Sequence, residues 1–232
     1  KIPVNGNPRS PNGVKSYFNK LSAIWKKVSK LDNPFASTKP KEVRTKSKAM
    51  SLDDVIKIRD NNIKGHLNSK GGGIKNFLNY WMLCFYLGGI DLVDLKEMKY
   101  SNIINGRIEF VRNKGGTNVF VSNFIFPEAW EIINQYNCKP YLVPLYKLDY
   151  EAFHGNMSRY YQHIMDELNL SRKPYSKAPR YTFINRAKEL LIDERICVEI
   201  VGHSQNSTHS IYKDEFPYSV RDEAHAKIIN LK

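Results

Sequence analysis

The first regular pattern of apolar residues in the chain predicts a helix over residues 10–30. Ser10 suits the N-cap position and Pro11 suits the first turn. The apolar residues that follow at helical spacing are Val14, Phe18, Leu21, Ile24, Trp25 and Val28. A helix with this much apolar surface needs a packing partner, and no earlier segment of the sequence supplies one. We therefore expect residues 1–32 to be the end of a helical domain whose preceding part lies outside this sequence.

A polar interval follows this helix. Prolines and a run of Ser, Thr and Lys residues predict a basic linker over residues 33–50. A helix is then predicted over residues 52–59, because Ser51 and Asp54 have the spacing of a capping box at a helix start. We expect residues 51–232 to form a second, larger domain.

The larger domain is predicted to be mainly helical with one small β-hairpin. An apolar helix is predicted over residues 74–87 and a short one over 91–98. The Asn-Gly pair at 105–106 marks a tight turn before a strand over 107–112, and a returning strand is predicted over 117–122. Further helices are predicted over 127–136, 155–168, 179–192, 194–201, 207–213 and 217–230. The expected fold class is mainly α with a small antiparallel β-sheet.

Positive charge is concentrated at the amino-terminal end of the chain. The net charge is +13, and residues 1–48 carry +10 of it, with 12 Lys and Arg but only Asp32 and Glu42. Because phosphate neutralisation drives nucleic-acid affinity, this distribution favours double-stranded DNA as a partner. A solubilising, partly disordered tail is the alternative. The candidate DNA-binding residues are Lys26, Lys27, Arg44, Lys46 and, on the predicted hairpin, Arg112.

The cysteines and the hydropathy pattern exclude several classes of protein. Cys84, Cys138 and Cys197 are far apart and form no CxxC pair, so we expect neither a metal site nor a disulfide framework. No apolar run approaches the roughly 20 residues that a membrane helix needs. The amino terminus has no secretory signal pattern. We therefore expect a cytoplasmic, nucleoid-associated protein without a membrane partner.

Four residues offer chemistry suited to a phosphate, although each has an ordinary explanation when taken alone. Lys114 occupies the turn between the two predicted strands, where an exposed lysine is common. Arg180 lies in the first turn of a predicted helix, where free N–H groups attract phosphate. His203 follows Gly202, a natural helix C-cap, and a structural loop histidine is the usual alternative. Tyr212 would ordinarily be a half-buried packing residue.

Together these residues resemble the carboxy-terminal signature of the tyrosine recombinase (phage integrase) family. Arg180 precedes His203 by 23 positions, and Tyr212 follows His203 by nine. Upstream, the segment GIDLVDLKEM at 89–98 resembles the family's first box, and the hairpin carries Lys114 where the family places a lysine. The resemblance covers nearly the whole chain. It is closer to integrases of mobile elements, of the conjugative-transposon type, than to housekeeping resolvases.

The resemblance implies the tyrosine recombinase catalytic-domain fold and a site-specific recombinase that cleaves and rejoins DNA. Tyr212 would attack a DNA phosphate and form a 3′-phosphotyrosyl link. Arg180 would hold the phosphate, and Lys114 would protonate the leaving 5′-oxygen. His203 would bond the phosphate or assist proton transfer, with Lys177 at the histidine position of the family's HxxR motif. The implied reaction needs no metal or other cofactor, and the implied partners are DNA and further protomers in a tetrameric synapse.

Two positions depart from the family pattern. The first-box arginine is replaced by Asp91, the alternative position three residues earlier is Gly88, and Lys177 replaces the HxxR histidine. In one interpretation Arg112 or Arg107 supplies the missing charge. In a second the protein is weakened, or active only with partners on bent DNA, and in a third it is a degenerate integrase that only binds DNA. A helical DNA-binding regulator does not explain the motif spacing, and a type IB topoisomerase fits the first box and linker less well.

Overall fold

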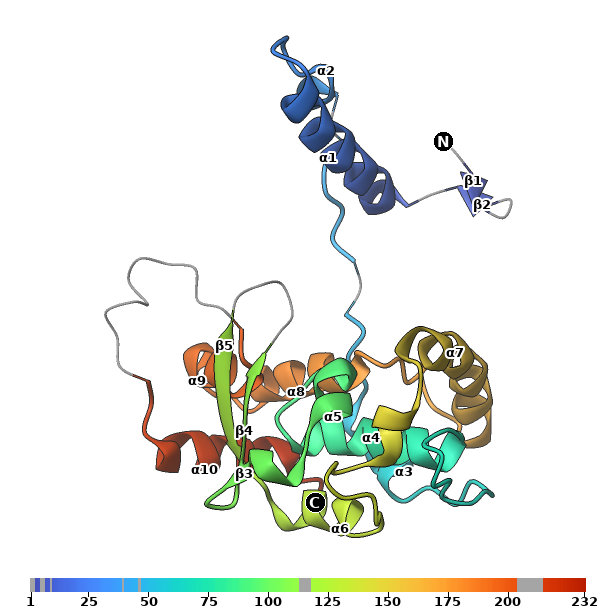
Figure 1. Ribbon diagram of the computed structural model, residues 1–232, viewed down its shortest axis with the longest axis vertical. Coiled ribbons are helices and arrows are strands. Elements are labelled where there is room, and N and C mark those ends of the chain that lie inside the picture. The colour runs from blue at the N-terminus through green and yellow to red at the C-terminus, as the bar shows by residue number, and fades with distance from the viewer. Residues whose placement is uncertain are drawn as a thin grey trace. The chain divides into compact units, whose positions relative to one another are not determined.

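The computed structural model describes residues 3–4, 7–8, 10–38, 40–45, 47–112, 118–203 and 215–232. It divides into two compact units, Lys1–Ser47 and Lys48–Lys232 (Figure 1). Within the described ranges, none of the helices combines the length and the apolar character needed to cross a lipid bilayer.

The smaller unit is built on one long helix, α1 (Pro11–Val28), with two short antiparallel strands before it, β1 (Pro3–Val4) and β2 (Asn7–Pro8). As predicted, Ser10 caps α1, and its Oγ accepts a hydrogen bond from the Gly13 N–H at 3.2 Å.

The predicted linker contains a short helix that the sequence analysis did not anticipate, α2 (Pro34–Ser37). Phe35 of α2 packs edge-on against the rings of Phe18 and Trp25 of α1, with ring centroids 6.2 Å apart in both pairs. The Asn33 side chain caps this turn by accepting the Phe35 N–H at 3.0 Å. The turn forms because an aromatic contact with α1 outweighs the weak helical pattern of its own four residues.

The larger unit is organised around α4 (Ile74–Tyr86), a helix that is buried along most of its length. An apolar helix of this kind is stable only when other elements cover all of its faces. The helices that pack against it are α3 (Leu52–Arg59), α5 (Leu92–Glu97), α6 (Pro127–Ile133), α8 (Ala178–Glu189) and, through aromatic rings, α7 (Tyr150–Glu167). Two short 3₁₀ segments belong to the same unit: η1 (Tyr100–Asn102) follows α5, and η3 (Pro144–Lys147) lies between α6 and α7.

A three-stranded antiparallel sheet completes the larger unit. Its strands are β3 (Ile103–Ile104), β4 (Arg107–Arg112) and β5 (Val119–Phe124), in that order. α9 (Glu194–Val201) packs against β5, and α10 (Tyr218–Ile229) packs against α8 and α9. In Figure 1 the sheet with α9 and α10 lies on one side of α4 and α7 lies on the other.

The mainly helical class with a small antiparallel sheet is confirmed, with differences in detail. The helices predicted over 52–59 and 194–201 match at both ends. The returning strand begins at Val119 instead of 117, and the edge strand β3 was not predicted because two residues are too few to show alternation. α7 begins at Tyr150, five residues before the prediction. The helix predicted over 207–213 lies outside the described residues.

A tight turn after α4 brings the first box close to α8. Gly88 and Gly89 have φ values of 92° and 70°, a region that side chains with a Cβ rarely adopt. A Cβ on Gly89 would lie 3.1 Å from the Cα of Arg180. The absence of a side chain therefore allows the turn and the start of α8 to come into backbone contact.

Candidate active site

Arg180 lies at the meeting point of three chain segments. It sits in the first turn of α8 and is only 6% exposed. Its Nη1 donates to the Gly89 carbonyl at 2.9 Å, and its Nη2 donates to the Val201 carbonyl at 2.6 Å. The guanidinium thus joins the first-box turn to the end of α9, the helix that precedes His203.

Three other charged side chains act on the Arg180 guanidinium: those of Arg112, Asp91 and Asp94. Burial, and next the positive charge of Arg112, lower the Arg180 pKa to about 10, while Asp91 and Asp94 oppose this shift. Two cations and two anions therefore share one buried region. Arg180 stays protonated at neutral pH, since its pKa remains well above 7.

The Gly-His pair ends α9 in the way that the sequence predicts. Gly202 adopts the left-handed conformation with φ 65° and ψ 48°. The His203 N–H donates to the Val198 carbonyl at 3.0 Å and the Gly202 N–H donates to the Glu199 carbonyl at 3.2 Å, the pattern of a Schellman motif. His203 is exposed and lies two residues after the Val201 carbonyl that accepts from Arg180.

Arg112, at the end of β4, is buried instead of lying on the surface as an ordinary DNA-contacting residue would. It is 8% exposed. Its Nη2 forms an ion pair with Asp91 Oδ2 at 2.6 Å, and its Nε lies 3.9 Å from Asp94 Oδ2. Its Nη1 donates to the Gly202 carbonyl at 2.9 Å. The side chain therefore spans the distance from the start of α5 to the end of α9.

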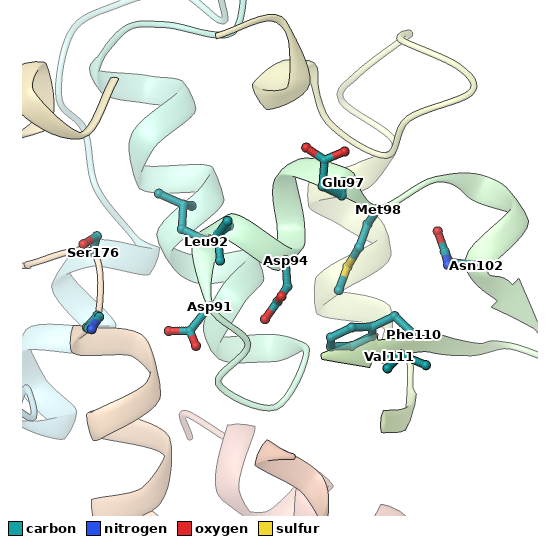
Figure 2. Close-up of a pocket in the computed structure, with 11 residues that line it drawn as sticks. Asp91, Leu92, Asp94, Glu97, Met98, Asn102, Phe110, Val111 and Ser176 are labelled. Atoms are coloured by element: carbon teal, nitrogen blue, oxygen red, sulfur yellow. The ribbon is translucent and has the colours of Figure 1, made fainter. Parts of the chain in front are cut away.

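A pocket of about 620 Å³ opens beside this cluster. Asp91, Asp94 and Glu97 of the α5 segment line it, together with Val111 of β4 and the exposed Lys177, which precedes α8. Figure 2 shows Asp91 and Asp94 projecting from α5 into the space between the Ser176 segment and the strand that carries Val111. In the part of the chain that the structure describes, no three His, Cys, Asp or Glu side chains are placed to hold a metal ion.

Of the remaining predicted site residues, some lie outside the described residues and the others lie in the smaller unit. Lys114 belongs to the segment that joins β4 to β5, and Tyr212 to the segment that joins α9 to α10, and both lie outside the described residues. Lys46 also lies outside them. The other candidate DNA-binding residues, Lys26, Lys27 and Arg44, are exposed in the smaller unit. The structure thus brings together Arg180, the Gly-His pair, Arg112 and Asp91, with Lys177 at the edge of the same pocket.

No protein-family model and no curated protein matches this sequence, but solved structures match the fold. A dimer of a lambda integrase fragment bound to a COC′ core site aligns with a TM-score of 0.60 at 16% identity, covering 89% of this chain and 76% of that chain. The integrase from mycobacterium phage Brujita aligns with a TM-score of 0.56 at 18% identity, covering 96% of this chain and 74% of that one. The chain has the fold of the phage integrases.

A third match shows an assembly. A lambda integrase tetramer bound to a Holliday junction aligns with a TM-score of 0.54 at 17% identity, covering 88% of this chain and 58% of that chain. The expectation of a tyrosine recombinase fold is therefore confirmed. At these identities the likeness concerns the fold, and the roles of individual residues rest on the local geometry.

Asp91 and Asp94 both face Arg112, which the sequence pattern did not predict. One available signal was their spacing, because residues three apart at a helix start lie on one face. The bond from Arg180 to the Gly89 carbonyl had no sequence signal, since a backbone acceptor can be supplied by any residue.

Proposed function

We propose that this chain is a tyrosine recombinase of the integrase type that cleaves and rejoins double-stranded DNA. The observation that carries the proposal is the buried position of Arg180, which bridges the first-box turn and the end of α9. Three motifs that are distant in the sequence converge there, in a chain with the fold of phage integrases. A resemblance to integrases of mobile elements is part of the same proposal.

In the proposed reaction the Tyr212 hydroxyl attacks a DNA phosphorus atom. A bond forms between the tyrosine oxygen and phosphorus, and the bond from phosphorus to the 5′-oxygen breaks. The tyrosine proton passes to a neighbouring base such as His203, and Lys114 gives a proton to the leaving 5′-oxygen. A 5′-hydroxyl of another strand then reverses the step. Since the phosphotyrosyl link keeps the energy of the original bond, rejoining requires no cofactor.

Arg180 and Lys177 have electrostatic roles in this proposal. The negative charge on the non-bridging oxygens grows as the phosphorus becomes five-coordinate, and fixed cationic donors stabilise it. Arg180 is held by two backbone carbonyls and is therefore already oriented. Lys177 at the pocket edge supplies a second cation in place of the family's histidine.

The alternative function is DNA binding without cleavage. The observation that favours it is Asp91, a buried carboxylate at the position of the family's first arginine. A carboxylate cannot donate to a phosphate oxygen and would repel it. Further protomers on DNA are proposed under both functions, by analogy with the integrase tetramer on a Holliday junction.

A covalent-capture experiment separates the two functions. The chain is incubated with a pool of randomised duplexes, each nicked so that the strand fragment released by cleavage diffuses away and cannot be rejoined. We expect DNA that remains attached to protein after denaturation in detergent, and we expect Tyr212→Phe to abolish it. Tyr218→Phe is the matched control, since Tyr218 is an exposed tyrosine of α10. DNA binding without any covalent product from the unaltered chain would establish the alternative.

A further inference from the structure

The departure at Asp91 raises the question of what supplies the missing cation. If the chain cleaves DNA as proposed, stabilising the negative charge on the phosphate requires cationic donors besides Arg180. Two buried arginines lie on the neighbouring strand β4, at its first and last residues, Arg107 and Arg112. Their hydrogen-bond partners differ, and this difference indicates which of the two arginines can bind the phosphate.

Arg107 binds α10 and the neighbouring strand β5 instead of facing the candidate site. Its Nη1 and Nη2 bond the two carboxylate oxygens of Asp222 of α10 at 2.6 and 3.0 Å. Its Nε and Nη2 also donate to the Ser122 hydroxyl and carbonyl at 2.9 Å. A guanidinium held at both ends in this way fastens the sheet to α10 and has little capacity left for a ligand.

Position 88 is closed to an arginine. Gly88 has φ 92°, and a Cβ there would lie 2.5 Å from Asn123 Nδ2 and 2.9 Å from Ile200 Cγ2. Asn123 cannot move aside easily, because its Nδ2 donates to the Leu87 and Ile200 carbonyls at 3.0 and 2.9 Å. The missing cation therefore cannot come from this turn.

Arg112 has the required position and spare donors. It bonds Asp91, which occupies the first-box position, and the carbonyl of Gly202, next to His203. The guanidinium groups of Arg112 and Arg180 lie near each other, because they donate to the consecutive carbonyls of Gly202 and Val201. Among the described residues Nη1 and Nη2 each donate one N–H, which leaves one further N–H on each of them, while the buried Nε faces Asp94 Oδ2 at 3.9 Å.

We propose that Arg112 is the second phosphate-binding arginine of this site and that Asp91 is the residue that positions it. The inference rests on the proposed function. The cation reaches the phosphate from strand β4 instead of from the first box, and the carboxylate at the first-box position holds it there. Gly202 is part of this arrangement, because a Cβ at that position would lie 3.5 Å from the Arg112 Cδ and 2.5 Å from Val121 Cγ2.

Charge balance makes the loss of Arg112 more damaging than the loss of one donor. Asp91 and Asp94 both face Arg112, at 2.6 and 3.9 Å. Without Arg112 its positive charge no longer offsets these two carboxylates, and their negative charge opposes binding of the phosphate beside Arg180. We therefore expect Arg112→Met to slow DNA cleavage by at least the factor of about 10²–10³ that removal of one transition-state donor typically causes.

The test uses the duplex recovered by covalent capture, synthesised with either a phosphate or a neutral methylphosphonate at the mapped cleavage position. A methyl group in place of one non-bridging oxygen removes the negative charge that Arg112 would neutralise. We expect Arg112→Met to be slow on the phosphate and to regain most of its rate, relative to the unaltered chain, on the methylphosphonate. A residue that only maintains the fold would slow both substrates equally.

Two further variants are controls that distinguish a loss of folding from a loss of phosphate binding. Arg107→Met removes a buried, ion-paired arginine from the same strand, and we expect no selective recovery on the methylphosphonate. The double variant Asp91→Asn/Arg112→Met removes both charges of the ion pair, so that the loss of Arg112 leaves no excess negative charge at position 91. Thermal unfolding confirms that each variant is folded, and we expect the double variant to show the same methylphosphonate recovery as Arg112→Met.

The outcomes separate the inference from the proposed function. If the unaltered chain cleaves DNA and folded Arg112→Met cleaves the phosphate at a similar rate, the inference is overturned and the proposed function stands. Equal slowing on both substrates, or equal recovery by Arg107→Met, overturns the inference in the same way. If the covalent capture itself gives no product from the unaltered chain, both the inference and the proposed function are overturned.

Discussion

His225 offers a quantitative test of the packing of α10 against α8 and the end of α4. It is 1% exposed, and its ring lies edge-on between those of Phe126 and Phe183, with centroids 5.0 and 5.3 Å away. Its Nε2 donates to the Tyr86 carbonyl at 2.9 Å, while Nδ1 has no hydrogen-bond partner among the described residues. A proton on Nδ1 would place a charge between aromatic rings, with no acceptor.

Burial lowers the His225 pKa from 6.5 to about 4, and the positive charge of Arg107 acts in the same direction. The unfolded chain therefore binds more protons than the folded chain between these two values, and stability falls as the pH decreases through this window. A difference of about 2.5 pKa units corresponds to about 3 kcal/mol. At pH 7 this cost is absent, because the ring is neutral in both states.

We expect His225→Gln, which can still donate to the Tyr86 carbonyl but does not titrate, to remove this pH dependence. Urea unfolding of both chains at pH 7 and pH 4 gives four free energies of unfolding. The unaltered chain should lose about 3 kcal/mol more than the variant between the two pH values. His66→Gln, at an exposed position of the same unit, is the control and should behave as the unaltered chain. Parallel pH curves for His225→Gln and the unaltered chain would refute the reasoning.

Further predictions concern the turns and the basic segment. Gly202→Ala should lower the free energy of unfolding by about 2–5 kcal/mol in urea unfolding, since its φ is 65° and a Cβ would meet Val121 at 2.5 Å; an unchanged midpoint would contradict this. Gly88→Arg should be destabilised by a similar amount, about 2–5 kcal/mol, and a covalent-capture yield above that of the unaltered chain would show that the turn does accept an arginine. Lys26→Gln/Lys27→Gln should reduce the magnitude of the log–log salt slope of DNA binding by about 1.8, and an unaltered slope would mean that these exposed lysines do not contact phosphate.

Much of the local structure could be predicted because it depends on neighbouring residues. The helix that begins after Ser51 and the one that ends before Gly202 were predicted at the observed ends, since capping hydrogen bonds join residues two to five positions apart. The separation of 23 positions between Arg180 and His203 spans α8, a turn and α9, so a sequence motif can encode it.

Other features depended on contacts that sequence spacing does not encode. Phe35 starts a helical turn in the expected linker because it meets the rings of Phe18 and Trp25. The two-residue strand β3 exists only because β4 offers it a hydrogen-bonding edge. In both cases the energy comes from a partner element instead of from the segment's own pattern.

The candidate site shows the same division. The sequence alone determined which residue types are present. It has Asp91 where the family that it resembles has an arginine, and it has a basic residue, Arg112, at the end of a predicted strand. Only the tertiary structure decided that Asp91 and Arg112 form an ion pair at 2.6 Å and that Arg107 turns instead to Asp222 of α10. The direction of each arginine is set by the packing of α5, α9 and α10 around the sheet. Those long-range contacts arise when the whole core is buried, and they leave no periodic signature in the chain.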